Sequence, residues 1–336
     1  MNILGIESSC DECSAAVVVD GAKIASNIVA TQVDIHRPYY GVVPELASRT
    51  HTEWIEPIVS KALRDAGLTA EGIDGIAVTN RPGLVGSLLV GLSFAKSMAY
   101  GLSVPFAAIN HIEAHLYAAH LENDIEYPYI GVIVSGGHTI IGRVSDVFSM
   151  EVLGTTIDDA CGEAFDKIAK YYDFGFPGGR ELDRLARRGS PEAFCFPSPS
   201  LHKGEHLYDV SYSGLKTAAA NQLEMFLVEG YEATNENIAA GFERAAIDHL
   251  VERVERAAYD TDVRRIVVGG GVAANTYLRR LLDESPYEVY IPSMKLCTDN
   301  GAMIAGLGYH HIQTGGVSDL ATNAFSRVDG FRITYP

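Results

Sequence analysis

Asn2-Ile-Leu-Gly-Ile-Glu-Ser-Ser9 and Tyr129-Ile-Gly-Val-Ile-Val-Ser-Gly-Gly-His138 are the two stretches that decide the fold. Each is a short apolar run, typical of a β-strand, that ends in a turn of serine or glycine. A second apolar run follows each turn, beginning at Ala15 and at Thr139, and a third begins at Lys23 and at Met150. The sequence therefore predicts the same group of three strands twice.

Each group of strands is followed much later by one more strand, a glycine-containing loop and a helix. In the first half these are Gly75–Thr79 and the apolar stretch Leu84–Leu102; in the second half they are Arg265–Gly269 and the helix that begins at Tyr277. Strands that alternate with helices predict α/β layers. A duplication of this size predicts two similar domains that face each other across a cleft, which is where ligand sites concentrate.

The length and composition agree with two globular domains. The chain has 336 residues, of which 47% are hydrophobic, so a disordered chain is excluded. Its 26 basic and 43 acidic residues give a net charge of −17. This charge argues against a protein whose whole surface binds nucleic acid, but it allows a local basic patch.

Targeting signals are not expected. The N-terminus has neither a basic region nor a long apolar region, so no signal peptide is predicted. The apolar stretch 84–102 contains Lys96 and a face of small residues, which favours a packed helix over a membrane span. The five cysteines are odd in number and lack the spacing of a disulfide framework. We therefore expect a cytoplasmic protein that makes no membrane contact.

His111 and His115 form the sharpest chemical motif. On a helix, residues four apart lie on one face, so both imidazoles can share a metal ion. Glu113 is not adjacent to His111, which excludes the zinc-protease motif H-E-x-x-H. The pair is either a metal site, which then needs a third ligand such as a carboxylate, or two packing histidines.

Two glycine-rich turns follow predicted strands of the duplicated unit. Ser135–His138 joins two strands, and residues 269–275 join a strand to a helix. Backbone N–H groups in such turns can hold phosphate or carboxylate oxygens. Acidic residues stand near the turns, and they are either ligands or solvated loop charges: Asp11, Glu12, Asp158, Asp159, Glu163, Asp166 and Asp299.

Ordered motifs along essentially the whole chain resemble one family. They are Glu7-Ser-Ser-Cys-Asp-Glu12, Val42-Val-Pro-Glu-Leu-Ala-Ser-Arg49, His111-Ile-Glu-Ala-His115, Val134-Ser-Gly-Gly-His138, Asp158-Asp-Ala-Cys-Gly-Glu-Ala-Phe-Asp-Lys167, Pro177-Gly-Gly179, Ser213-Gly-Leu-Lys-Thr217, Gly270-Gly-Val-Ala-Ala-Asn275 and Thr298-Asp-Asn-Gly-Ala302. The sequence resembles the TsaD family, the bacterial tRNA N6-adenosine threonylcarbamoyltransferases, formerly labelled glycoproteases. It departs from the family at Tyr40 and Arg81, where glycine is usual, and at Arg180, where proline is common.

The resemblance implies an α/β fold of two duplicated actin/hsp70/sugar-kinase-like (ASKHA) domains. The first would comprise residues 1–128 with the C-terminal 302–336, and the second residues 129–301, with an insert at about 174–213. The resemblance also implies one divalent metal ion, iron or zinc, held by His111, His115 and Asp299. Substrate would be contacted by Val134, Ser135, Gly136, Gly137, His138, Asp166, Gly179, Asp183 and Asn275.

The implied activity is transfer of the threonylcarbamoyl group from threonylcarbamoyl-AMP to N6 of adenosine 37 in tRNAs that read codons beginning with A. Asp11 or Glu12 is the candidate for accepting the N6 proton. The implied partners are tRNA, a TsaB-like paralogue and a TsaE-like ATPase. The alternative is an actin-like ATPase, kinase or scaffold without transferase activity, which has no need for two helix histidines and a third ligand.

The acidic chain has one concentration of basic residues, in the insert. It comprises Arg180, Arg184, Arg187, Arg188, Lys203, His202 and His206. We expect this cluster to provide a weak, salt-sensitive contact with tRNA that is shared with the partners.

Overall fold

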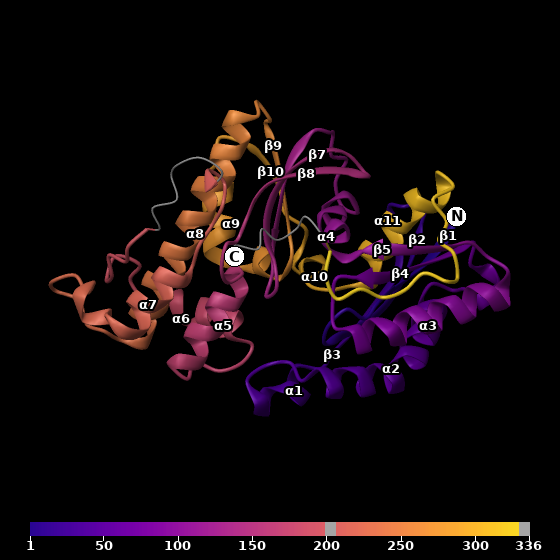
Figure 1. Cartoon of the computed structure of the whole chain (residues 1–336), viewed down its shortest axis with the longest axis horizontal. Helices are drawn as coiled ribbons and strands as arrows, with labels where there is room; N and C mark the ends of the chain where they lie inside the picture. Colours follow the sequence, from indigo (N-terminus) through magenta and orange to yellow (C-terminus); the bar gives the residue numbers. More distant parts are fainter. Residues whose placement is uncertain (199–205, 329–336) are drawn as a thin grey trace. The chain divides into compact units, whose positions relative to one another are not determined.

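The computed structural model describes residues 1–198 and 206–328, which form two compact units (Figure 1). The first unit comprises Met1–Ile125 and the segment that begins at Pro292, and the second spans Glu126–Ile291. The chain thus returns to the first unit at Pro292, before the expected position 302. As a consequence, Asp299 belongs to the same unit as His111 and His115.

The first unit contains a five-stranded sheet in the order β3-β2-β1-β4-β5. Strands β1, β4 and β5 are parallel, and β2 and β3 are antiparallel to their neighbours. The elements of this unit are β1 (Asn2–Glu7), β2 (Glu12–Val19), β3 (Lys23–Thr31), α1 (Val33–His36), η1 (Arg37–Tyr39), α2 (Pro44–Asp65), η2 (Ala70–Gly72), β4 (Gly75–Arg81), α3 (Val85–Leu102), β5 (Phe106–Asn110), α4 (His111–His120), α10 (Met294–Cys297) and α11 (Gly301–Gln313).

Helices cover both faces of this sheet. Leu4 and Ile6 of β1 point to the core that α2 and α3 share with the sheet. The alternate residue Gly5 faces α11, and a Cβ at Gly5 would lie 2.2 Å from the carbonyl oxygen of Gly301. Only glycine allows α11 to approach β1 this closely, and this packing positions the segment around Asp299.

The second unit contains a five-stranded sheet in the order β10-β9-β6-β7-β8. Its α5, α6, α7 and α8 pack against one another (Figure 1). The elements are β6 (Tyr129–Val134), β7 (Thr139–Asp146), β8 (Ser149–Thr155), α5 (Cys161–Tyr171), α6 (Gly178–Ala186), α7 (Ser213–Asn221), η4 (Leu223–Met225), α8 (Asn235–Asp260), β9 (Arg265–Gly269), η5 (Gly271–Ala274), α9 (Thr276–Asp283) and β10 (Glu288–Tyr290).

The two sheets have the same design. In each, three consecutive strands form an antiparallel meander, and the first of them pairs in parallel with a later strand: Ile3 of β1 opposes Gly75 of β4, and Ile130 of β6 opposes Ile266 of β9. The duplication predicted from the two strand–turn–strand stretches is therefore present in the pairing of the strands.

The apolar helix α3 is long and apolar enough to cross a membrane by length and composition alone. Its small residues Ser87, Gly91, Ala95 and Ala99 are buried, and Gly91 packs against the side chain of Ser8. The small face is therefore used in the core of the first unit, as in the core helix of a folded domain. On the remaining surface of α3, Val85, Leu89 and Tyr100 are exposed.

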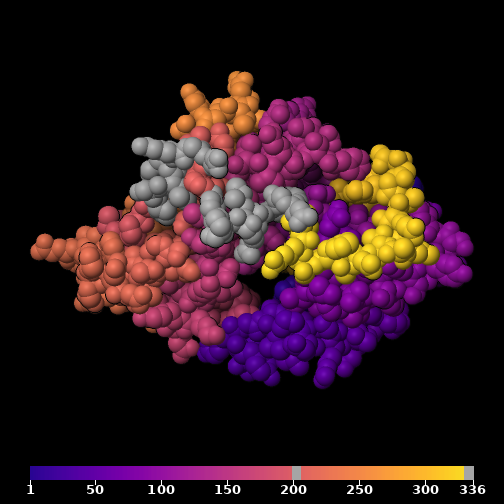
Figure 2. All heavy atoms as spheres, in the orientation of Figure 1, coloured from indigo at the N-terminus to yellow at the C-terminus, as the bar shows by residue number. Residues whose placement is uncertain are grey.

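The C-terminal segment after α11 crosses the surface of the first unit without forming a helix or strand up to residue 328 (Figure 2, yellow). The amide of Ser318 donates to the carbonyl oxygen of Phe106 over 2.7 Å, and that of Phe325 to Asn80 over 2.9 Å. None of the five cysteines forms a disulfide, as expected for reduced thiols.

The insert and Tyr40 each have a defined local structure. The insert that begins near Phe174 contains a helix, α6, whose buried residues Gly178, Leu182 and Ala186 lie four apart on one face. Tyr40, which stands where the family usually has glycine, adopts a left-handed conformation with φ of 51°. That backbone conformation is the one glycine adopts without steric cost.

Candidate metal centre and substrate site

The two histidines of the H-x-x-x-H motif lie on the first turns of α4. Asn110 ends β5 and caps this helix, because its side-chain oxygen accepts the amide N–H of Ile112 over 3.0 Å. The helix starts at His111, so His115 lies one turn further on the same face. Their Nε2 atoms are 3.1 Å apart, and both rings are buried.

Asp299, which is far from the two histidines in the sequence, completes the group. It precedes Asn300, whose side chain caps α11 by accepting the amide N–H of Met303. Oδ1 of Asp299 lies 3.1 Å from Nε2 of His115 and 3.5 Å from Nε2 of His111. The three ligand atoms lie within 4.8 Å of one another, so the structure brings together the residues predicted as metal ligands.

Carboxylates control the charge of this group. Burial disfavours the imidazolium form of His111, but the charges of Asp299 and Glu7 outweigh burial and raise the pKa of His111 to about 9. Burial and the charge of His111 lower the pKa of His115. Burial opposes ionisation of Asp299, yet His111 and His115 hold its pKa well below the usual range. The carboxylates of Glu7 and Asp299 thus favour a positive charge beside them in this buried group.

The donor set fits a metal ion. Two imidazole nitrogens and one carboxylate oxygen converge on one point, which is a combination suited to iron and zinc. Glu113 faces elsewhere, since its carboxylate accepts a hydrogen bond from the Asn110 side chain over 2.8 Å. This agrees with the exclusion of a zinc-protease site.

Glu12, one of the two candidates for the proton acceptor, lies at the start of β2. Burial raises the pKa of Glu12 well above its usual value, and the nearby charges of Asp11 and Asp299 raise it further. Asp11 precedes the strand, and its carbonyl oxygen accepts the amide N–H of Gln32. Both candidates therefore belong to the unit that carries the metal ligands.

The turn Val134–His138 in the second unit links β6 to β7. Its own serine organises it, since Oγ of Ser135 accepts the amide N–H groups of Gly137 over 3.3 Å and of His138 over 3.1 Å. The amide of Ser135 donates to the carbonyl oxygen of His138. These N–H groups, expected as donors to substrate, are engaged within the turn.

The other predicted substrate residues lie in the same unit and form two groups. Asp166 of α5 accepts the amide N–H of Gly179 over 3.1 Å. Asp183 of α6 accepts the amide N–H of Thr276 over 3.0 Å, next to Asn275. The loop that begins at Gly270, and leads to Asn275, packs against the turn Val134–His138, since a Cβ at Gly270 would lie 2.4 Å from the carbonyl oxygen of Val134.

Sequence reasoning assigned no role to two buried carboxylates beside these residues. Glu243 of α8 accepts a hydrogen bond of 2.6 Å from the Asn275 side chain, whose oxygen caps α9. Glu7 contacts His111. A signal for Glu7 was available, because it ends the first predicted strand and the carboxyl ends of parallel strands share one edge of a sheet. Glu243 lies within a helical pattern that gives no such signal.

The basic cluster is largely neutralised. Arg184 pairs with Glu181, Arg187 with Asp183, and Arg188 approaches Glu236 to 3.9 Å. His206 pairs with Asp209, and His202 and Lys203 lie outside the described residues. Arg180 is exposed and has no ion pair among the residues that the structure describes.

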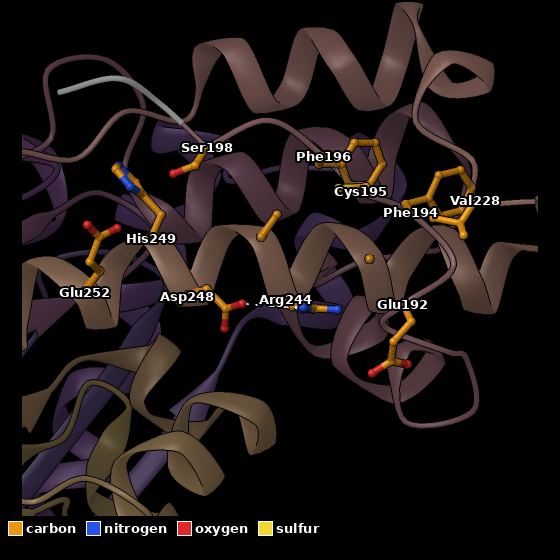
Figure 3. A pocket seen from close by; sticks show the side chains of 12 residues that line it. Glu192, Phe194, Cys195, Phe196, Ser198, Val228, Arg244, Asp248, His249 and Glu252 are labelled. Carbon is orange, nitrogen blue, oxygen red and sulfur yellow. Dashed lines mark ion pairs between the residues drawn. The ribbon is translucent and has the colours of Figure 1, made fainter. Parts of the chain in front are cut away.

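A separate pocket of about 340 Å³ lies in the second unit between α8 and residues 192–198 (Figure 3). Phe194 and Phe196 stack along one side, and the ion pair of Arg244 and Asp248 lies on α8. None of the predicted metal or substrate residues lines this pocket.

The fold and the site define a duplicated α/β protein with a two-histidine, one-aspartate group able to bind a metal. Solved structures with this architecture include component A of the (R)-2-hydroxyglutaryl-CoA dehydratase of Acidaminococcus fermentans, with a TM-score of 0.56 and 15% identity over 93% of this chain and 99% of that one. HypF of T. kodakarensis gives a TM-score of 0.61 and 14% identity over 93% of this chain and 48% of that one. These likenesses confirm the predicted ASKHA-like α/β fold class.

The family model for TsaD, described as tRNA N6-adenosine threonylcarbamoyltransferase, matches residues 23–306. A protein of that name from Treponema denticola is 58% identical over 332 residues, which cover 98% of both chains. Another from Borrelia hermsii is 50% identical over 334 residues, 99% of this chain and 98% of that one. The chain therefore belongs to the TsaD family, and the expectation of a transferase is confirmed.

Proposed function

We propose that the chain transfers the threonylcarbamoyl group of threonylcarbamoyl-AMP to N6 of adenosine 37 in tRNAs that read codons beginning with A, forming N6-threonylcarbamoyladenosine. The observation that carries this proposal is the convergence of His111, His115 and Asp299 in a chain that matches the family over nearly its whole length. The alternative of an ATPase, kinase or scaffold is not favoured, because it does not account for this group.

His111 and His115, through Nε2, and Asp299, through Oδ1, would hold one divalent iron or zinc ion. When bound, such an ion supplies a Lewis acid that polarises a carbonyl or steadies a phosphate. The chain itself excludes water from the ligands, since His111 and His115 are 8% and 1% exposed. Burial also strengthens the interaction of the carboxylate with a cation.

The second unit would hold the adenylate. The turn Val134–His138 and the loop that begins at Gly270 are in contact, which supports a shared site for phosphate and nucleoside. Ser135 holds the amides of Gly137 and His138 together, so a substrate oxygen that replaces its hydroxyl meets two aligned donors. Asp166 and Gly179 lie on the adjacent α5 and α6.

The N6 amine is a poor nucleophile, so its proton must be accepted as the new bond forms. Asp11 or Glu12 would accept this proton, and burial, which raises the pKa of Glu12 well above its usual value, makes that carboxylate a stronger base than an exposed one. AMP leaves with the electron pair of the mixed anhydride bond.

Family membership supports a TsaB-like paralogue and a TsaE-like ATPase as partners, and a cytoplasmic location. The exposed apolar residues Val85, Leu89 and Tyr100 of α3 provide a surface for the paralogue. The small face of α3 does not, because it is buried.

The test combines the purified chain, its partners, threonylcarbamoyl-AMP and tRNA, followed by mass spectrometry of the nucleosides. We expect threonylcarbamoyladenosine in wild-type reactions and none when guanosine replaces adenosine 37. ATP hydrolysis by the isolated chain without any adduct in the complete reaction would instead support the ATPase alternative.

A further inference from the structure

Three neighbouring parallel strands of the first unit end beside the candidate metal centre. Glu7 is the last residue of β1, Thr79 lies near the end of the adjacent β4, and His111 follows β5 directly. The pairing of Ile6 with Val78 places Glu7 next to Thr79. Carboxyl ends of parallel strands meet at one edge of a sheet, so a carboxylate, a hydroxyl and an imidazole are brought together here.

The carboxylate of Glu7 is fully buried and accepts three hydrogen bonds. Its Oε1 accepts the amide N–H of Ser9 over 2.6 Å, and its Oε2 accepts the hydroxyl of Thr79 over 2.5 Å. Oε2 also lies 2.9 Å from Nδ1 of His111. The amide of Ser9 holds Oε1, so Oε2 stays directed at the ring, and the hydroxyl of Thr79 is a further donor to Oε2.

We propose that Glu7 is a positioning residue of the metal centre, which keeps a hydrogen on Nδ1 of His111, so that Nε2, which faces His115 and Asp299, is the nitrogen that exchanges its proton for a metal ion. A carboxylate can only accept, so its partner nitrogen must carry hydrogen. Partners of this kind set the orientation and basicity of metal-binding imidazoles. The inference rests on the metal centre of the proposed function.

The hydroxyl of Ser9 cannot replace the Glu7 carboxylate as the partner of Nδ1 of His111. Its Oγ lies 3.3 Å from Nδ1 of His111 and 3.5 Å from Oδ2 of Asp299, both longer than the bond to Glu7. A hydroxyl can also donate to Nδ1, which would leave the hydrogen on Nε2 and block that atom as a ligand. A carboxylate at this position excludes that tautomer.

The first test compares Glu7→Gln with Thr79→Val in the full-length chain. The Gln side chain nearly preserves the shape of Glu, but it places an NH₂ group against one of the donors that now face the carboxylate. Thr79→Val removes a buried donor to the same Oε2 and leaves the bond to His111, so it is the matched structural control.

The readouts are the Kd for Co²⁺ by competition with a chelator and the visible absorption of the bound Co²⁺. Glu7→Gln is expected to weaken Co²⁺ binding about 10- to 100-fold and to alter the absorption bands, whereas Thr79→Val changes the Kd less than about threefold. Equal Kd values and spectra for Glu7→Gln and wild type overturn the inference alone, as does equal weakening in both variants. A wild-type chain that binds no Co²⁺ or Zn²⁺ overturns the metal centre and the inference with it.

The second test needs no Glu7 variant and therefore holds if Glu7→Gln does not fold. ¹⁵N NMR of the Zn²⁺-loaded wild-type chain distinguishes the two ring nitrogens, and the ring signals of His111 are assigned by through-bond correlation with its own backbone amide. We expect hydrogen on Nδ1 and zinc on Nε2. Zinc on Nδ1 overturns the inference.

Discussion

Oδ1 of Asp299 lies 3.1 Å from Nε2 of His115, although 184 positions separate the two residues in the sequence. The packing of α11 on β1 produces this contact, because Gly5 lets the helix start close to the sheet. The first unit alone therefore contains all three candidate ligands.

Removal of one ligand is expected to abolish both metal and activity. Asp299→Ala leaves two buried imidazoles, which do not hold a divalent ion firmly without the carboxylate. We expect the metal content, measured by inductively coupled plasma mass spectrometry, to fall from one ion per chain to near zero, and the tRNA adduct to disappear. His120→Ala, at the far end of α4, is the control and should retain both. An Asp299→Ala chain that transfers normally without metal contradicts the proposed mechanism.

Gly270 is expected to tolerate no side chain. Its φ is +96°, and a Cβ would lie 2.4 Å from the carbonyl oxygen of Val134. Gly270→Ala should destabilise the chain by about 2 kcal/mol or more, because backbone strain and a clash with backbone add. At Gly271 a Cβ meets nothing within 4 Å. Gly271→Ala should therefore shift urea unfolding by less than about 0.5 kcal/mol, and equal effects of the two variants would refute the argument.

Strands, helices and the duplication were predictable because they depend on local periodicity. The strand expected at Gly75–Thr79 and the helix expected in the apolar stretch 84–102 correspond to β4 and α3, and the meanders of both units begin at the two quoted stretches. The spacing of His111 and His115 fixed one face of α4. The third ligand, Asp299, came from the family resemblance, since no local pattern links it to α4.

The charges of α6 show a signal in the sequence that was not used. Glu181 and Arg184 are three apart, and Asp183 and Arg187 four apart, which is the spacing of ion pairs on a helix. The basic residues of the insert alone predicted a contact with tRNA, and this spacing shows that two of the arginines have acidic partners on the same helix. By contrast, the contact of Asn275 with Glu243 joins α9 to α8. Such a contact depends on helix packing, which periodicity does not determine.

Glu243 is expected to make stability fall with pH. Burial raises its pKa from 4.5 to about 8, Asp183 adds to this, and Asn275 and Arg187 oppose it. Between these values the unfolded chain loses the proton while the folded chain retains it, so the free energy of unfolding decreases as pH rises from about 4.5 to 8. Glu243→Gln cannot ionise, so it should be the more stable protein above pH 8, and its difference from wild type should grow as pH rises from about 4.5 to 8.

Urea unfolding at several pH values checks this prediction. Glu53→Gln, which neutralises an exposed carboxylate of α2 that has no ion pair among the described residues, is the control. Its stability should follow that of wild type at each pH. A constant difference between Glu243→Gln and wild type from pH 5 to 9 would show that Glu243 does not titrate in this range.

Arg180 and Arg188 are expected to carry the tRNA contact of the second unit. Arg187 is unsuitable for the test because its guanidinium pairs with Asp183, whereas Arg180 is exposed and Arg188 is only 3.9 Å from Glu236 at its nearest. Charge reversal of Arg180 and Arg188 to glutamate should weaken tRNA binding by the assembled complex. It should also reduce the slope of log Kd against log salt by about 1 for each phosphate that the variant no longer neutralises. The double variant Arg264→Glu with Lys23→Glu, which reverses two exposed basic residues outside α6, is the matched control. If the double variant and the control bind tRNA with the same salt dependence, the tRNA meets another part of the surface, because counterion release reports only the charges that meet phosphate.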